Sequence, residues 1–188
     1  MCKTMIIFCI VLILFFGGLA GAGITNLQNS WLDKDELISG TINWVDSAST
    51  LQLLETWGAM GSVTSSTIGA ADVDPFIHII KQINNDSGFA WTDYHIQISG
   101  QGAAYIPGSA TSDRFSTVVE NGNNIDFFSP LIVPVNDSVT LGFDIQVASG
   151  TFSFSISQTP TPEPATIGLL GLGALTILRK KRSVLLNL

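Results

Sequence analysis

Apolar side chains alternate with polar or small ones in Val139-Thr140-Leu141-Gly142-Phe143-Asp144-Ile145-Gln146-Val147. After a short break, Ala148-Ser149-Gly150, the alternation resumes with Phe152, Phe154 and Ile156 on one side. Successive side chains of a β-strand point to opposite faces, so a period of two indicates a strand with one buried face. This part of the chain therefore predicts two consecutive strands.

The same period occurs in residues 77–83 and residues 94–98. Clusters rich in Asn, Gly and Ser separate such stretches, with a hairpin loop predicted at residues 84–88 and another turn at residues 120–124. Short strands with turns at this spacing are typical of sandwiches and barrels. We predict an all-β domain over residues 23–157, an antiparallel β-sandwich of jelly-roll or immunoglobulin-like type.

Three stretches depart from this pattern. Residues 49–57 contain leucines that could form one or two turns of helix, and residues 58–71 are rich in Gly, Ser and Thr, which predicts a long loop or an edge region. Residues 158–164 hold three prolines at alternating positions. Proline lacks an N–H donor and favours an extended chain, so we predict a stiff linker after the end of the fold.

Composition limits the classes of function. The chain has 188 residues, enough for one ordinary domain and its targeting segments. Between residues 23 and 161, the basic residues are Lys34, Lys81 and Arg114, against fourteen acidic ones. Binding to nucleic acid depends on Lys and Arg that neutralise phosphates, so we expect no nucleic-acid partner.

Residues 1–22 have the three parts of a secretory signal peptide. Lys3 is the positive charge, residues 5–16 form an apolar run, and Ala20 and Ala22 are small residues that signal peptidase accepts. The alternative is a retained anchor, but the apolar run is shorter than the ~20 residues that a spanning helix needs. We expect export through the secretion translocon and cleavage after Ala22. Both cysteines lie in this segment, so the mature protein would contain no disulfide.

A second apolar segment lies near the end of the chain. Residues 165–178 are apolar or small and would form a helix about 21 Å long at ~1.5 Å per residue, short for a hydrocarbon core of about 30 Å. The segment has no polar face for water, which argues against a soluble helix. Arg179, Lys180, Lys181 and Arg182 follow it and predict a cytoplasmic end by the positive-inside rule.

Pro162, Glu163 and Pro164, followed by this apolar segment and its basic cluster, resemble the PEP-CTERM sorting signal. That signal occurs in exported proteins of bacteria that make exopolysaccharide. In that family, exosortase, a membrane enzyme, recognises the signal and the helix is removed during export. The resemblance implies that residues 162–188 form the sorting signal and that Pro162, Glu163 and Pro164 are its recognition motif.

The resemblance also assigns the rest of the tail. Residues 165–178 would cross the inner membrane in transit, and residues 179–182 would be the cytoplasmic stop. The implied destination is the cell surface or the extracellular matrix of a biofilm. Thr161 stands where the family often has Val, and residues 183–188 extend beyond the basic cluster, which leaves the position of processing open.

The middle of the chain offers one candidate for ligand binding, residues 88–96. If exposed, Trp91 and Tyr94 could stack on a sugar ring while Asp93 and His95 hydrogen-bond to its hydroxyl groups. Aromatic side chains at strand positions belong to the core more often than to a binding platform, so both interpretations stay open.

Catalytic motifs are missing from the sequence. It contains no Gly-x-Ser-x-Gly, no His-Glu-x-x-His and no phosphate-binding glycine loop. His78 and His95 are the only histidines. If their strands pair through the loop at residues 84–88, they would lie near one another, but a metal site needs further ligands. We therefore expect no metal, no cofactor and no enzymatic activity.

These features predict an exported, non-enzymatic structural or adhesive component of the extracellular matrix. The first alternative is a carbohydrate-binding module for exopolysaccharide that uses Trp91, Tyr94 and also Trp57. The second is a hydrolase, which would need two carboxylates, or a serine with His78 or His95, in one pocket. The expected partners are signal peptidase, the translocon, exosortase and, in transit, the inner membrane.

Overall fold

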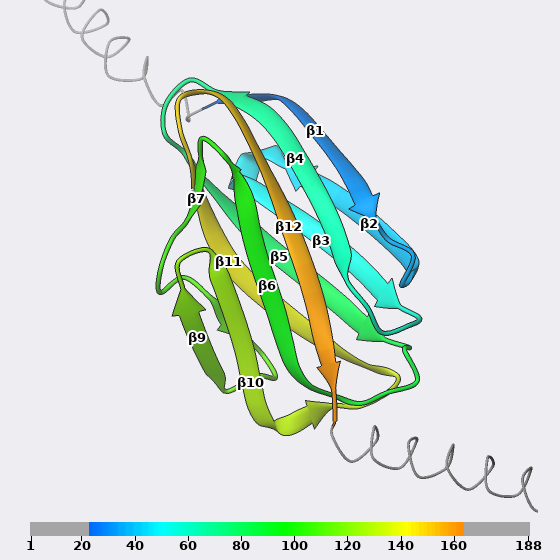
Figure 1. Cartoon of the computed structure of the whole chain (residues 1–188). Coiled ribbons are helices and arrows are strands. Elements are labelled where there is room, and N and C mark those ends of the chain that lie inside the picture. Colours follow the sequence, from blue (N-terminus) through cyan, green and yellow to red (C-terminus); the bar gives the residue numbers. More distant parts are fainter. Residues whose placement is uncertain (1–22, 164–188) are drawn as a thin grey trace, which may run out of the picture.

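Two β-sheets packed face to face make up the folded part of the chain (Figure 1). A computed structural model describes residues 23–163. Its elements are β1 (Ile24–Asp33), β2 (Leu37–Val45), η1 (Asp46–Ala48), β3 (Thr50–Trp57), β4 (Val63–Ala71), β5 (Phe76–Asn85), β6 (Trp91–Gln101), β7 (Ala103–Tyr105), β8 (Thr111–Ser112), β9 (Thr117–Asn121), β10 (Asn124–Val133), β11 (Asp137–Val147) and β12 (Gly150–Pro162). The predicted all-β class is confirmed.

Sheet A has the order β1-β4-β12-β6-β10-β9, and every pair in it is antiparallel. Sheet B has the order β2-β3-β5-β11-β7, with β8 also on β11. In sheet B, β3 and β5 pair in parallel, so the predicted antiparallel character does not hold for this pair. The physical reason is the route of the chain. After β3 the chain forms β4 in sheet A, which runs back the other way, so β5 enters sheet B with the same polarity as β3.

The core lies between the sheets and follows the predicted alternation. In β11, the side chains of Val139, Leu141, Phe143, Ile145 and Val147 are buried, whereas those between them are partly or fully exposed. β12 repeats this arrangement with Phe152, Phe154 and Ile156 inside. Burial of each such side chain stabilises the folded state by roughly 1.5–3 kcal/mol. The residues that follow the period of two therefore make the largest stabilising contribution to the fold.

Two of the predicted irregular stretches are strands. Residues 50–57 form β3 instead of a helix, with Leu51, Leu53, Glu55 and Trp57 facing the core. Residues 63–71 form β4 instead of a loop, and this strand lies between β1 and β12. A Cβ atom on Gly69 of β4 would lie 2.7 Å from the Phe152 ring, so small residues there make room for the aromatic core.

The predicted boundary at residue 157 is also wrong, because β12 continues to Pro162. From Ser153 to Gln158 it pairs on both sides, with β4 and with β6. Beyond Gln158 it pairs only with β6, where Pro160 lies opposite Tyr94. A strand edge without a neighbour tolerates proline, because no donor is needed there. Most of the predicted linker is therefore part of sheet A.

The connections differ from the prediction in one respect. The turn predicted at residues 120–124 is present, and it joins β9 to β10 in an antiparallel hairpin. The loop at residues 84–88 instead leads from β5 in sheet B to β6 in sheet A, so it forms no hairpin. Asn85 is fully buried and holds this loop by donating to the carbonyl oxygens of Phe89 and Val133, at 2.8 and 3.1 Å.

The predicted targeting segments lie outside the described residues. This applies to residues 1–22 with Ala20 and Ala22, to Pro164, to the apolar residues 165–178 and to the basic residues 179–182. Within residues 23–163, no helix is both long enough and apolar enough to cross a membrane.

Candidate functional site

The aromatic rings predicted to contact a glycan lie inside the core. Trp57, Trp91 and Tyr94 have no exposed surface, and the ring centroids of Trp57 and Trp91 are 5.9 Å apart. The indole N–H of Trp91 donates to the Ser87 hydroxyl at 3.0 Å, and the Tyr94 hydroxyl donates to Gln158 at 2.8 Å. These rings join the two sheets, because Trp57 lies on β3 of sheet B and Trp91 and Tyr94 lie on β6 of sheet A. Of the two interpretations left open by the sequence, Trp91 and Tyr94 therefore belong to the core and form no platform for a sugar.

Asp93 and His95 differ from these rings, because both are partly exposed. The His95 side chain stands on the outer face of sheet A, between the neighbouring strands β10 and β12. Of the four residues predicted to contact a glycan, only these two remain accessible to a ligand.

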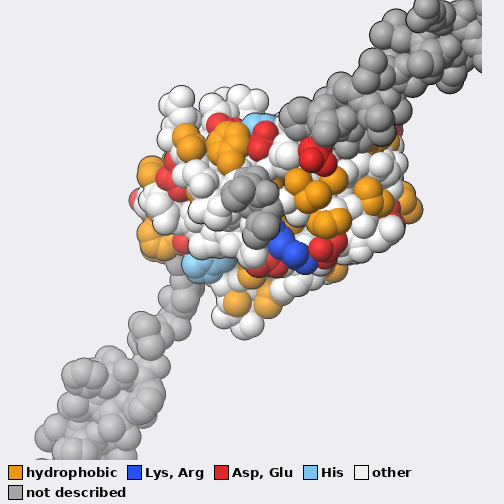
Figure 2. All heavy atoms as spheres, turned by 90° about the horizontal axis from the view of Figure 1, so that it is seen from below, with side chains coloured by type: hydrophobic (Ala, Val, Ile, Leu, Met, Phe, Trp, Pro, Cys, Tyr) orange, Lys and Arg blue, Asp and Glu red, His pale blue; other side chains and the backbone are white. Residues whose placement is uncertain are grey.

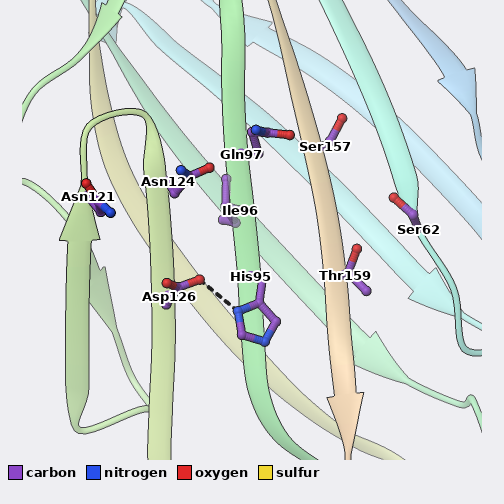
Figure 3. A pocket seen from close by; sticks show the side chains of 9 residues that line it. All are labelled: Ser62, His95, Ile96, Gln97, Asn121, Asn124, Asp126, Ser157 and Thr159. Carbon is purple, nitrogen blue, oxygen red and sulfur yellow. Dashed lines mark hydrogen bonds and ion pairs between the residues drawn. The ribbon is translucent and has the colours of Figure 1, made fainter.

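A polar groove of about 380 Å³ lies on this outer face (Figure 3). Its lining consists almost entirely of hydroxyl, amide, carboxylate and imidazole groups. The lining residues are Ser62, His95, Ile96, Gln97, Asn121, Asn124, Asp126, Ser157 and Thr159. They come from the residue before β4, from β6, β10 and β12, and from the end of β9, beside the turn that joins β9 to β10 (Figure 3). Such groups can donate and accept hydrogen bonds with the hydroxyl groups of a sugar.

A chain of hydrogen bonds crosses three strands at this groove. His95 Nδ1 lies 2.7 Å from Asp126 Oδ1, and His95 Nε2 lies 3.0 Å from Thr161 Oγ1. With a neutral ring that donates from Nδ1 to the carboxylate, Nε2 accepts a hydrogen bond from the threonine hydroxyl. The chain fixes the orientation of the imidazole on the floor of the groove.

Sequence reasoning missed most of this groove. Gln97, Asn124 and Asp126 were not singled out, although each is the outward neighbour of a buried strand residue such as Ile96 or Ile125. The alternation identifies which side chains face outward. It does not show that β6, β10 and β12 are neighbours, and this order is what brings the polar groups together.

The two histidines do not share a site. His78 stands on the outer face of sheet B, where its Nδ1 lies 2.6 Å from Asp144 Oδ1, whereas His95 stands on sheet A. The two histidines do not lie near one another, because the loop at residues 84–88 leads from sheet B to sheet A and β5 therefore does not pair with β6. In the described part of the chain, no group of three or more His, Cys, Asp or Glu side chains is arranged to hold a metal ion.

Both tyrosines of the chain have a raised pKa. For Tyr94, burial is the main cause, and the negative charge of Glu55 adds to it. For Tyr105, burial and a hydrogen bond donated to Glu120 raise the pKa to about 12. The same bond lowers the pKa of Glu120, because the phenol stabilises the carboxylate.

We expect the folded protein to resist ionisation of its tyrosines. A raised folded-state pKa stabilises the fold fully below the unfolded value of ~10, and this contribution is lost as the pH rises through the folded value, about 12 for Tyr105. A spectrophotometric alkaline titration should therefore show no tyrosinate near pH ~10. Tyr105→Phe should remove the step assigned to Tyr105. A normal titration of either residue in the folded protein would contradict the prediction.

The predicted recognition motif begins inside the last strand. Pro162 lies opposite Trp91 in the β12–β6 ladder, and the Glu163 N–H donates to the Ala90 carbonyl at 2.9 Å. The first two residues of the motif are therefore attached to sheet A, while Pro164 lies beyond the described residues. The body of the folded domain and the motif follow each other without a spacer.

Three solved structures resemble this chain weakly. The pre-peptidase C-terminal domain of a Bacillus anthracis collagenase is 11% identical, with a TM-score of 0.28, and the match covers 56% of this chain and 94% of that one. A structure of the Fap1 fimbriae of Streptococcus parasanguinis is 13% identical, with a TM-score of 0.32, over 65% and 66% of the two chains. The chitin-binding domain of a Pyrococcus furiosus chitinase is 14% identical, with a TM-score of 0.24, over 70% and 86%.

The tail gives a more specific result. A comparison with curated proteins found no match. In contrast, residues 160–182 match the family model of the PEP-CTERM protein-sorting motif, which confirms the resemblance seen in the sequence. The match includes the end of β12, the Pro-Glu-Pro motif, the apolar segment and the basic cluster. The chain thus carries a PEP-CTERM sorting motif, which indicates an exported protein that exosortase sorts to the cell surface.

Proposed function

We propose that the mature protein is a non-enzymatic, adhesive component of the extracellular matrix, and that the groove on sheet A contacts exopolysaccharide. The observation that carries this proposal is the groove itself, a row of hydroxyl and amide groups on the outer face of a rigid sheet. Side chains on strands keep fixed positions, as a binding site requires. The sorting motif provides the context, because it directs the domain out of the cell.

The charge of the surface indicates which class of glycan the groove would bind. On the face shown in Figure 2, acidic side chains occur at several separate places, whereas the blue of Lys and Arg appears at a single small place. Within the groove, Asp126 carries a carboxylate and no Lys or Arg is among the lining residues. A polyanionic glycan would be repelled, so the preferred ligand is a neutral polysaccharide.

The proposal is tested with the double variant Gln97→Ala/Asn124→Ala in the full chain. Both side chains are exposed in the groove, so the fold should be unaffected. Two lost hydrogen bonds, each worth about 0.5–1.5 kcal/mol, should weaken binding about tenfold. The measurement is co-sedimentation with neutral exopolysaccharide from the producing cells.

A matched control exists on the opposite sheet. Gln82→Ala/Asn84→Ala removes the same two residue types from exposed positions of β5 and should leave binding unchanged. Equal binding by the groove variant and the control would refute the assignment of the groove, and absence of binding by the unaltered chain would refute the glycan proposal.

The hydrolase alternative has one observation in its favour. Asp126, His95 and Thr161 are connected in the order of carboxylate, imidazole and hydroxyl that activates a nucleophile in some hydrolases. We nevertheless propose a binding role, in which this chain of bonds orients His95. Labelling of Thr161 by a fluorophosphonate probe, lost in His95→Ala, would contradict the non-enzymatic proposal.

A further inference from the structure

A lysine and a glutamate are in contact inside the sandwich. Lys81 of β5 and Glu55 of β3 both face the core, with 0% and 2% of their surface exposed. Lys81 Nζ contacts Glu55 Oε1, and the indole N–H of Trp57 donates to Glu55 Oε2 at 3.0 Å. Lys81 lies opposite Leu53 in the parallel ladder, so Glu55 is its diagonal neighbour two residues along β3. Each carboxylate oxygen therefore has one partner.

A charged pair is costly in this position. Removing an ammonium and a carboxylate from water costs several kcal/mol for each ion, and their attraction does not always offset it. Burial lowers the pKa of Lys81, although the charge of Glu55 and its hydrogen bond act in the opposite direction. A reaction that removes both charges would therefore also remove this cost.

We propose that these two side chains are joined in the mature protein by an amide bond between Lys81 Nζ and Glu55 Cδ. The nitrogen attacks the carboxyl carbon, the C–N bond forms and the bond from Cδ to Oε1 breaks. The two protons that the ammonium group loses leave with Oε1 as one molecule of water. Oε2 becomes the amide oxygen. No oxidant, reductant or activating group is needed for this balance.

Three features of the site favour the reaction. Two strands hold the nitrogen and the carboxyl group in contact, and well-oriented groups of this kind reach effective molarities of ~10⁵–10⁸ M. The Trp57 N–H already binds the oxygen that keeps its place in the product, and it stabilises negative charge there as the nitrogen adds. The core excludes water, which would otherwise hydrolyse the amide.

The bond would supply a covalent link to a domain that lacks disulfides. Cys2 and Cys9 are the only cysteines of the chain, and both precede the described residues. The proposed link closes the segment between β3 and β5, which includes β4 and both passages between the sheets. A closed segment of this kind restricts the unfolded chain as a disulfide does.

Mass spectrometry of the full chain, denatured and digested with trypsin, tests the proposal. Lys34, Lys81 and Arg114 are the cleavage sites between residues 23 and 163. Trypsin does not cleave after an acylated lysine, so we expect residues 35–114 to remain one peptide. Its mass should be lower by one water molecule than the mass calculated from the sequence. Separate peptides of residues 35–81 and 82–114 at full mass would overturn the proposal.

Two variants assign the bond. Glu55→Leu should restore cleavage after Lys81, and Lys81→Met should give the peptide of residues 35–114 with no loss of mass beyond the substitution. The test of the bond is the peptide mass from the unaltered chain, so the result does not depend on whether these variants fold. A link that loses ammonia instead of water and joins Lys81 to the peptide containing Gln158 would refute Glu55 as the partner.

Discussion

The Trp91→Ala variant is expected to lose about 3–5 kcal/mol of unfolding free energy, the usual cost of replacing a fully buried tryptophan with alanine. Small domains have only about 5–15 kcal/mol in total, so the variant would be close to unfolding. The loss has two parts. The indole leaves a cavity between Trp57 and Tyr94, and the Ser87 hydroxyl loses the donor that now lies 3.0 Å away.

Chemical denaturation followed by circular dichroism measures this effect. Trp44→Ala is the matched control, because Trp44 is only partly buried and its indole hydrogen bond to Asp46 is exposed. We expect the control to cost much less than Trp91→Ala. Similar losses in the two variants would contradict the assignment of Trp91 to the centre of the core.

Most of the strands could be predicted because their pattern is local. In β11, each buried residue is followed by a polar or small one, so the sequence alone identifies the inner face. β3 has the same alternation, with Leu51, Leu53 and Trp57 inside, but Glu55 interrupts it. A glutamate is placed inside only when a partner is there, and Lys81 comes from a distant part of the chain. Local reasoning could not supply that partner, and a helix was predicted instead.

The end of β12 was also difficult to predict from the sequence. Prolines at positions 160 and 162 are typical of a linker, and they would disrupt the middle of a sheet. They are compatible with β12 because pairing with β4 ends at Gln158, which leaves one side of the strand without a neighbour. Strand order is a non-local property. For the same reason the groove could not be predicted, because its residues come from strands that are distant in the sequence.

Replacing Glu163 with alanine in the full chain should slow processing of the tail about tenfold or more. Leaving aside residues 129–131, the described part of the chain offers the Glu163 side chain no hydrogen-bond or ion-pair partner, and its N–H bond to Ala90 involves only the backbone. We therefore expect the stability of the domain to change by less than about 0.5 kcal/mol. The effect on processing has another cause, the loss of a charged group from the recognition motif. Such a contact is worth about 1.5–3 kcal/mol, which corresponds to a rate change of about tenfold or more.

The experiment compares the unprocessed precursor with the mature protein over time and determines the mature C-terminus by mass spectrometry. Thr159→Ala is the control, because Thr159 is exposed on the same strand but lies just before residues 160–182, which match the sorting motif. The control should mature at the normal rate. Because Pro162 pairs with β6 and the Glu163 N–H donates to Ala90 just before it, the domain holds the first two residues of the motif at the end of sheet A. Normal maturation of Glu163→Ala would mean that exosortase does not read this carboxylate, and delayed maturation of Thr159→Ala would mean that the strand itself is part of the signal.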